Sequence, residues 1–293
     1  MRVAWIVLAG IAVCAESAGA AVTPAEVTWK KELAYANDAW AHRHYAILKI
    51  QDAAYLREGD FATLAGSKGK PESYRWTKGA TAGVLVATVK GGHPSLTMNG
   101  RTYSESEIAN GISVDADVDI KGAPTQVDAG VIGARFMVYN QQAQPAKEFK
   151  GVDFFDYDPA YRITAQFKDD PKHPPRVFRT SRGTDKQFYH AGDATFTLQG
   201  KVVTLPFYAD DRKNISSMSA FFVDDLTGKE TYGAGRYVDV EGFGAYPPTA
   251  VTIDFNDAYN PNCARSPFFT CPVAVDAVAL AIRAGERDPH RSH

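Results

Sequence analysis

The feature that most constrains the fold is a two-residue period of apolar side chains that begins near residue 60. Short apolar runs alternate with polar residues and are broken by Gly, Pro and Asn, as in GVLVATVK, YRITAQF and DATFTLQGKVVTLPFYA. This period is typical of half-buried strands. Asn99-Gly100, between LTM and RTY, predicts a two-residue hairpin turn. Helical patterns do not alternate with these runs, so the sequence predicts a mainly β, antiparallel fold without βαβ units.

A polar stretch without periodicity, NQQAQPAKEFKG, interrupts the strand pattern at residues 140–151. We therefore expect two antiparallel β lobes, at residues 45–145 and 150–286, each a sandwich or a partly open barrel. Residues 287–293 are charged and lack apolar side chains, so they are predicted to form a flexible tail.

The first twenty residues have the pattern of a secretory signal peptide. Arg2 precedes an apolar stretch at residues 3–15, and small residues follow at Ala18 and Ala20. The stretch has 13 residues, fewer than the roughly 20 that a membrane-spanning helix needs. We predict cleavage after Ala20, no stable membrane span, and a periplasmic or secreted mature protein. An alternative is a lipoprotein acylated at Cys14, although Val13 stands where a small residue is expected.

An N-terminal helix is predicted at residues 23–44. Thr23, Pro24 and Glu26 form a helix-start signal, in which the threonine caps and the proline occupies the first turn. Trp29, Leu33, Ala36 and Trp40 then fall on one side at helical spacing. We expect this amphipathic helix to pack its tryptophan stripe against the β lobes, rather than to lie on a membrane.

Charge and spacing argue against two classes of partner. The formal net charge is −2, without a cluster of Lys and Arg, so no nucleic-acid partner is expected. Asp115, Asp117 and Asp119 alternate as in a calcium loop, but the glycine and glutamate that complete such a loop are missing. We expect no metal and no cofactor, and the sequence does not indicate the oligomeric state.

Cys263 and Cys271 are the only cysteines left after cleavage, and they lie in the loop NPNCARSPFFTC. A disulfide, a metal site and a catalytic thiol are all conceivable. The spacing does not match that of structural zinc pairs, and an oxidising compartment joins neighbouring thiols. We therefore predict a Cys263–Cys271 disulfide.

Four segments of the second lobe, in order, resemble a known family: FKGVDFFDYDPAYRITAQF, GKETYGAGRYVDV, IDFNDAYNPNCARSPFFTCPVA and IRAGE. They are similar to landmarks of the bacterial and archaeal proteins grouped as domain of unknown function 1684, over about residues 149–286. The resemblance implies no established activity. Two features depart from the family pattern: an Asn-Arg pair after Cys271 is missing, and Asn140 replaces an acid in the strand that contains Arg135.

The leading functional hypothesis is a binding protein without an assigned reaction. A small-molecule or envelope ligand would be bound by the second lobe, through Glu230, Tyr232, Arg236, Tyr259 and Asn260. Gly233 and Gly235 allow a close approach to Arg236, which we expect to lie beside Tyr232 or Glu230.

Two enzymatic alternatives use other residues. An envelope hydrolase would take its acid and base from Asp224, Asp225, Glu230 and Asp254. A cysteine-dependent hydrolase or transferase would use Cys263 as nucleophile and His190 as base, with Asp193 or Asp225 orienting the histidine.

Overall fold

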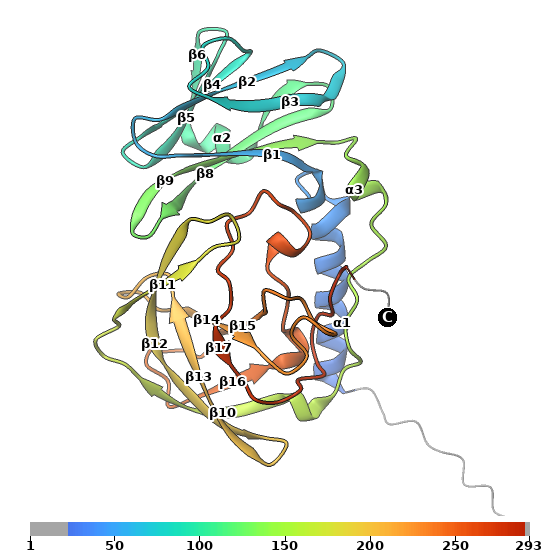
Figure 1. Cartoon of the computed structure of the whole chain (residues 1–293), viewed down its shortest axis with the longest axis vertical. Coiled ribbons are helices and arrows are strands. Elements are labelled where there is room, and N and C mark those ends of the chain that lie inside the picture. Colours follow the sequence, from blue (N-terminus) through green and yellow to red (C-terminus); the bar gives the residue numbers. More distant parts are fainter. Residues whose placement is uncertain (1–22, 291–293) are drawn as a thin grey trace, which may run out of the picture.

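The computed structural model describes residues 23–290, which form two β lobes with a helix beside them (Figure 1). The mainly β, antiparallel prediction is confirmed. Helix α1 runs along the second lobe, and the chain then enters the first lobe (Figure 1). The predicted signal peptide lies outside the described residues. Among the helices of residues 23–290, none is long and apolar enough to cross a membrane.

Helix α1 comprises Pro24–Asn37 and begins as predicted. The side chain of Thr23 accepts a hydrogen bond from the backbone N–H of Glu26 at 3.2 Å, and a π-helical turn at Asp38–His42 follows the helix. Trp29 donates its indole N–H to the backbone oxygen of Asn256 at 3.0 Å, which ties the helix to the second lobe. Trp40 is buried, but no residue of α1 itself is.

The first lobe is a sandwich of two antiparallel sheets, as predicted. One sheet has the order β1-β9-β8-β7 and the other the order β3-β2-β4-β5-β6. Leu56 and Phe136 of one sheet pack with Leu64 and Leu96 of the other in a common core. The elements are β1 (Ile50–Leu56), β2 (Phe61–Ser67), β3 (Lys70–Lys78), β4 (Leu85–Lys90), β5 (His93–Met98), β6 (Arg101–Tyr103), α2 (Glu105–Asn110), β7 (Ile112–Asp115), β8 (Val118–Asp128), β9 (Val131–Asn140) and α3 (Gln144–Lys147).

The turn chemistry of this lobe is partly as expected. Asn99 and Gly100 both have positive φ, 52° and 77°, and connect β5 to β6 as a tight hairpin. The alternating aspartates, by contrast, do not lie on one strand, because the chain turns between Asp115 and Val118. Asp119 is consequently buried, and its carboxylate accepts a hydrogen bond from the Nε2 of His44 at 2.8 Å.

The second lobe is one eight-stranded sheet that curls into a nearly closed barrel. Its main order is β15-β14-β13-β12-β10-β16, with β11 on β12 and β17 on β14. Tyr237 on β15 and Tyr259, just after β16, exchange two backbone hydrogen bonds of 2.9 and 3.0 Å, which brings the sheet ends together. The strands are β10 (Arg162–Asp169), β11 (Pro175–Arg179), β12 (Asp185–Leu198), β13 (Lys201–Ala209), β14 (Ser217–Val223), β15 (Arg236–Glu241), β16 (Ala250–Asp254) and β17 (Asp276–Ala277).

The two lobes meet through the cysteine loop and β12. Tyr55 of β1 donates its hydroxyl proton to the backbone oxygen of Phe268 at 3.0 Å. Phe268 and Phe269 pack against Ile50 and Met137 on the outer face of the first lobe. Phenylalanines that the sequence places in a loop thus help to hold the lobes together.

The C-terminal segment is packed rather than flexible as far as the structure describes it. Asp288 is buried, and its backbone N–H donates to the oxygen of Glu230 at 3.0 Å. Arg287 lies 3.7 Å from the carboxylate of Asp153. The flexible-tail interpretation, which rested on charge alone, therefore does not hold for residues 287 and 288, where polar partners replace the missing apolar contacts.

Candidate functional site

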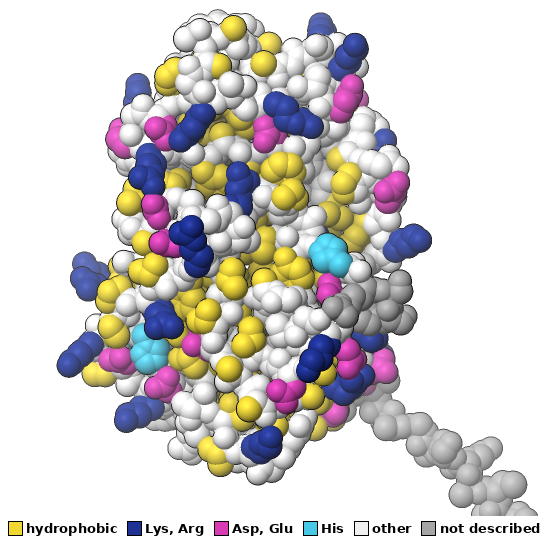
Figure 2. Space-filling view, in the orientation of Figure 1, with side chains coloured by type: hydrophobic (Ala, Val, Ile, Leu, Met, Phe, Trp, Pro, Cys, Tyr) yellow, Lys and Arg dark blue, Asp and Glu magenta, His cyan; other side chains and the backbone are white. Residues whose placement is uncertain are grey.

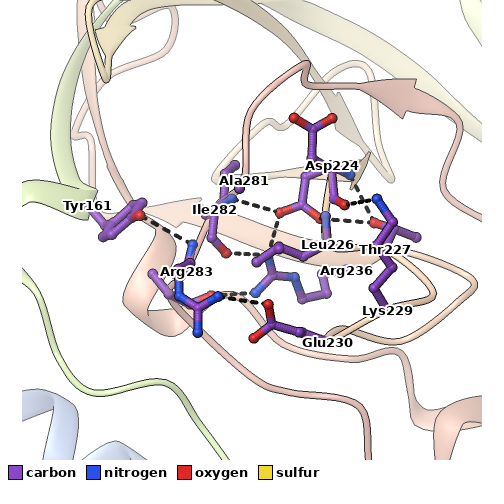
Figure 3. Close-up of polar contacts among 12 residues, drawn as sticks. Tyr161, Asp224, Leu226, Thr227, Lys229, Glu230, Arg236, Ala281, Ile282 and Arg283 are labelled. Carbon is purple, nitrogen blue, oxygen red and sulfur yellow. Dashed lines mark hydrogen bonds and ion pairs between the residues drawn. The ribbon is translucent and has the colours of Figure 1, made fainter.

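Arg236 is a buried structural residue and does not face a ligand site. It is 1% exposed, and its guanidinium lies 3.0 Å from Asp224, with further bonds to the carbonyls of Ile282 and Ala284 (Figure 3). The prediction that Arg236 lies beside Tyr232 or Glu230 was wrong. Strand β15 begins only at Arg236, so Tyr232 lies outside the strand. The ring beside the guanidinium is that of Phe222, with 5.3 Å between the guanidinium carbon and the ring centroid.

Glu230 and Asn260 also have structural partners. Glu230 forms an exposed ion pair with Arg283 at 2.7 Å (Figure 3). Asn260 is buried, and its side-chain amide donates to the carbonyl of Arg287 at 2.8 Å. The backbone N–H of Asn260 donates to Glu286 at 2.7 Å. These contacts fasten the C-terminal segment to the barrel.

A second buried ion pair, between Glu286 and Arg265, was not predicted from the sequence. The Arg265 guanidinium lies 2.6 Å from the Glu286 carboxylate, which is 2% exposed as a side chain. Burial raises the pKa of Glu286, and the charge of Arg265 opposes that shift. The only signal in the sequence was the position of Glu286 at the end of the family landmark IRAGE.

Cys263 and Cys271 come together in the folded protein, with Tyr232 beside them. Both are free thiols; Cys263 is half-buried and Cys271 is buried. A hydrogen bond from Cys271 lowers the pKa of the Cys263 thiol to about 6, with help from Ser181 and Tyr232, while burial opposes the shift. The proximity of the two thiols is what a disulfide requires, but the disulfide itself stays a prediction.

The structure does not bring the residues of either enzymatic alternative together in one site. His190 lies 3.0 Å from Asp170 through Nδ1 and 3.1 Å from Asp193 through Nε2, so neither ring nitrogen is available to Cys263. Asp224 is paired with Arg236, and Asp254 forms an ion pair of 2.9 Å with Arg162. Asp224, Glu230 and Asp254 are thus held in separate structural contacts.

Tyr259 is the one ligand candidate that lines a pocket between the lobes. This pocket has a volume of about 220 Å³. Its lining includes Tyr55 and Arg135 of the first lobe, with Lys186 and Tyr259 of the second. Cys271 also lines it, so the thiol pair lies at its wall.

A second pocket of about 240 Å³ adjoins the first, because both are lined by Arg135 and Phe269. Lys121 and Tyr139 are among its other lining residues. Hydrophobic side chains gather between the lobes on the face shown in Figure 2, with Lys and Arg side chains around them. We name the two adjoining cavities the interlobe pocket.

Within residues 23–290, neither Arg135 nor Lys186 forms an ion pair or a side-chain hydrogen bond. Burial is the main effect that lowers the pKa of Lys186; the positive charge of Arg135 adds to it, whereas Cys271 and Asp210 oppose it. Arg135 and Lys186 therefore line the interlobe pocket without an ion-pair partner among the described residues, although the charge of Asp210 acts on Lys186 from a greater distance. Lys186 and Tyr55 were not predicted as site residues, because nothing in their local sequence marks them.

Comparison with known proteins identifies the second lobe. Residues 147–287 match the family described as "Protein of unknown function (DUF1684)". The second lobe is therefore similar to the DUF1684 family, and we call it the DUF1684 lobe. The matched segment contains the DUF1684 barrel, the cysteine loop, and both buried ion pairs.

The chain is also similar to proteins of known structure. One is the solution NMR structure of an uncharacterized protein of Haloarcula marismortui. It is 29% identical, the match covers 50% of this chain and 80% of that chain, and the TM-score is 0.42. No curated protein matches the sequence.

Proposed function

We propose that this protein binds a small carboxylate with an apolar portion in the interlobe pocket. The observation that carries the proposal is the pair of cations, Arg135 and Lys186, which line the pocket without a direct ion pair to any described residue. Arg135 and Lys186 are half-buried, and a partly desolvated cation without an ion-pair partner is unfavourable, so a ligand carboxylate would offset that cost. A guanidinium also matches the two oxygens of a carboxylate.

The rest of the lining favours a ligand that is partly apolar. Tyr55, Tyr237 and Tyr259 present rings and Phe269 presents a fully apolar side chain. Such rings bury apolar ligand surface, while a few polar groups fix the orientation. A fully hydrated anion such as inorganic phosphate would leave this surface uncovered, so an aromatic or medium-chain acyl carboxylate fits best.

We further propose that binding takes place after export. The support for export is the signal-peptide pattern of residues 1–20, and cleavage would leave Cys263 and Cys271 as the only cysteines. Their thiols are in hydrogen-bonding contact, so oxidation would join them without a large movement. The disulfide would then fix the part of the wall that Cys271 forms.

The test is isothermal titration calorimetry with benzoate and octanoate on the chain that starts at Ala21. Lys186→Gln and Arg135→Gln should each weaken binding by about tenfold or more, because hydrogen bonds to charged groups contribute roughly 1.5–3 kcal/mol. Lys90→Gln is the matched control, since Lys90 is exposed on the first lobe. Acetate should bind much more weakly, because it lacks the apolar portion.

Two results would contradict the proposal. One is no binding of either carboxylate to the unsubstituted protein. The other is unchanged affinity in Lys186→Gln and Arg135→Gln, which would place the ligand elsewhere. Thermal unfolding of each variant shows whether the substitution has disturbed the fold.

A further inference from the structure

A separate cavity lies between helix α1 and the DUF1684 lobe. It has a volume of about 200 Å³. Three of the apolar residues that were expected to pack the helix, Trp29, Leu33 and Ala36, line it and are only half-buried. The apolar stripe of α1 therefore does not close completely on the lobe, and we call the space that it leaves the helix cavity.

Two aromatic rings form a corner of the helix cavity. The centroids of Trp29 and Phe154 are 6.2 Å apart, and the rings are inclined at 72°. The Trp29 ring is fixed by its hydrogen bond to Asn256 and by Tyr157, whose ring centroid is 5.7 Å away. Two differently oriented π-faces that are held in place can surround a cationic group, because each face carries negative charge density.

The rest of the lining consists of two carboxylates, Glu32 from α1 and Asp257 from the lobe, and of Tyr259, which also lines the interlobe pocket. Neither carboxylate forms a hydrogen bond or an ion pair through its side chain with another residue in the described part of the chain. Asp257 is exposed at the mouth, yet desolvation raises the pKa of its carboxyl to about 7. The charges of Asp254 and Glu32 add to this shift, and Arg162 opposes it.

We propose that the helix cavity binds a quaternary or fully methylated ammonium group. Aromatic faces attract such a cation, and the two carboxylates of Glu32 and Asp257 complement its charge. The group needs no hydrogen-bond acceptors, so it suits walls that are mainly apolar. A primary ammonium or a metal ion would lose its hydration without receiving enough oxygen partners in return. An anion would be repelled by both carboxylates.

The first experiment compares cations of equal charge. Calorimetric titration of the chain that starts at Ala21 should show binding of tetramethylammonium and choline, and much weaker binding of ethanolamine. Sodium chloride at equal ionic strength controls for the added salt. No heat from either methylated cation, or equal affinity for ethanolamine, would overturn the proposal.

Substitutions of Trp29 separate recognition from helix docking. Trp29→Phe and Trp29→Leu both lose the hydrogen bond to Asn256, but only the phenylalanine keeps a π-face. We expect Trp29→Leu to weaken choline binding by roughly five- to thirtyfold, and Trp29→Phe to retain part of the affinity. Equal affinities of the two variants would mean that the ring faces do not recognise the cation.

The pH dependence provides a test of Asp257 that a purely structural role would not affect. Its carboxylate form is lost as the pH falls through about 7, so choline affinity should fall with it, and binding near pH 7 should release a proton. Asp257→Asn should bind choline more weakly and without this pH dependence. Glu72→Gln, at an exposed position of β3, is the control and should behave like the unsubstituted protein.

The helix cavity and the interlobe pocket can be tested separately. Lys186→Gln removes a cation from the interlobe pocket only, and should leave choline affinity unchanged. A loss of choline binding in Lys186→Gln would contradict the assignment of the methylated ammonium group to the helix cavity. A failure of benzoate and octanoate to bind would leave the choline result unaffected.

Discussion

The buried pair of Arg236 and Asp224 should make one of the largest side-chain contributions to the stability of the DUF1684 lobe. Arg236→Met removes the cation and leaves the Asp224 carboxylate, which is 0% exposed, without its counter-ion. Breaking a buried pair in this way costs about 3–5 kcal/mol. Two carbonyls, those of Ile282 and Ala284, also lose their donor.

The free energy of unfolding of a domain is about 5–15 kcal/mol, so the Arg236→Met loss would be a large fraction of it. At roughly 2–4 °C per kcal/mol, the melting temperature should fall by roughly 6–20 °C. Arg236→Lys keeps the charge, but a compact ammonium does not reach all three acceptors at once, so we expect an intermediate loss. Thermal unfolding followed by circular dichroism, together with urea titration, measures both.

Arg283→Met is the matched control for Arg236→Met. Arg283 forms an ion pair with Glu230 in which the side chains are 55% and 32% exposed. Exposed pairs of this kind contribute about 0–1 kcal/mol. If Arg236→Met destabilised the protein no more than Arg283→Met does, the reasoning from burial would be refuted.

The remaining predictions concern export and the thiols. N-terminal sequencing of the exported protein should begin at Ala21 or within a few residues of it, and material that retains Met1 would contradict the signal peptide. Intact mass after alkylation without reductant should show no modified cysteine, because both thiols are joined in the disulfide; two modified cysteines would exclude it. The disulfide closes a short loop and should contribute about 2.5 kcal/mol to stability. In the reduced protein, alkylation of Cys263 should accelerate as the pH rises through about 6, whereas buried Cys271, whose pKa is raised, should stay slow. Equal rates at both cysteines, measured by peptide mass spectrometry, would contradict the asymmetry.

The hairpin turn and the start of the helix could be predicted from the sequence, because the residues that cause them are close together in the chain. The Asn99-Gly100 turn depends on two residues that tolerate positive φ, and the start of α1 depends on Thr23 and Pro24. Asp115, Asp117 and Asp119 alternate as they would on a single strand, and this pattern does not reveal the two-residue turn that separates Asp115 from Val118.

The candidate site could not be predicted from the sequence in this way, because the residues that form it are far apart in the chain. Arg236 lies in a glycine-rich segment that looks exposed, and its burial depends on carbonyls 46 and 48 residues away. The interlobe pocket combines Tyr55, Arg135 and Lys186, which no spacing rule connects. Only the packing of the two lobes brings these side chains to one place.

The division of the interlobe pocket between two modules has a consequence for its specificity. Tyr55 and Arg135 lie outside the segment that matches the DUF1684 family, whereas Lys186 and Tyr259 lie inside it. The family domain therefore supplies only part of the lining of the pocket that we propose binds the ligand. A chain that joined the same domain to a different first lobe would inherit Lys186 and the cysteine loop, but would select its ligand through another opposite wall.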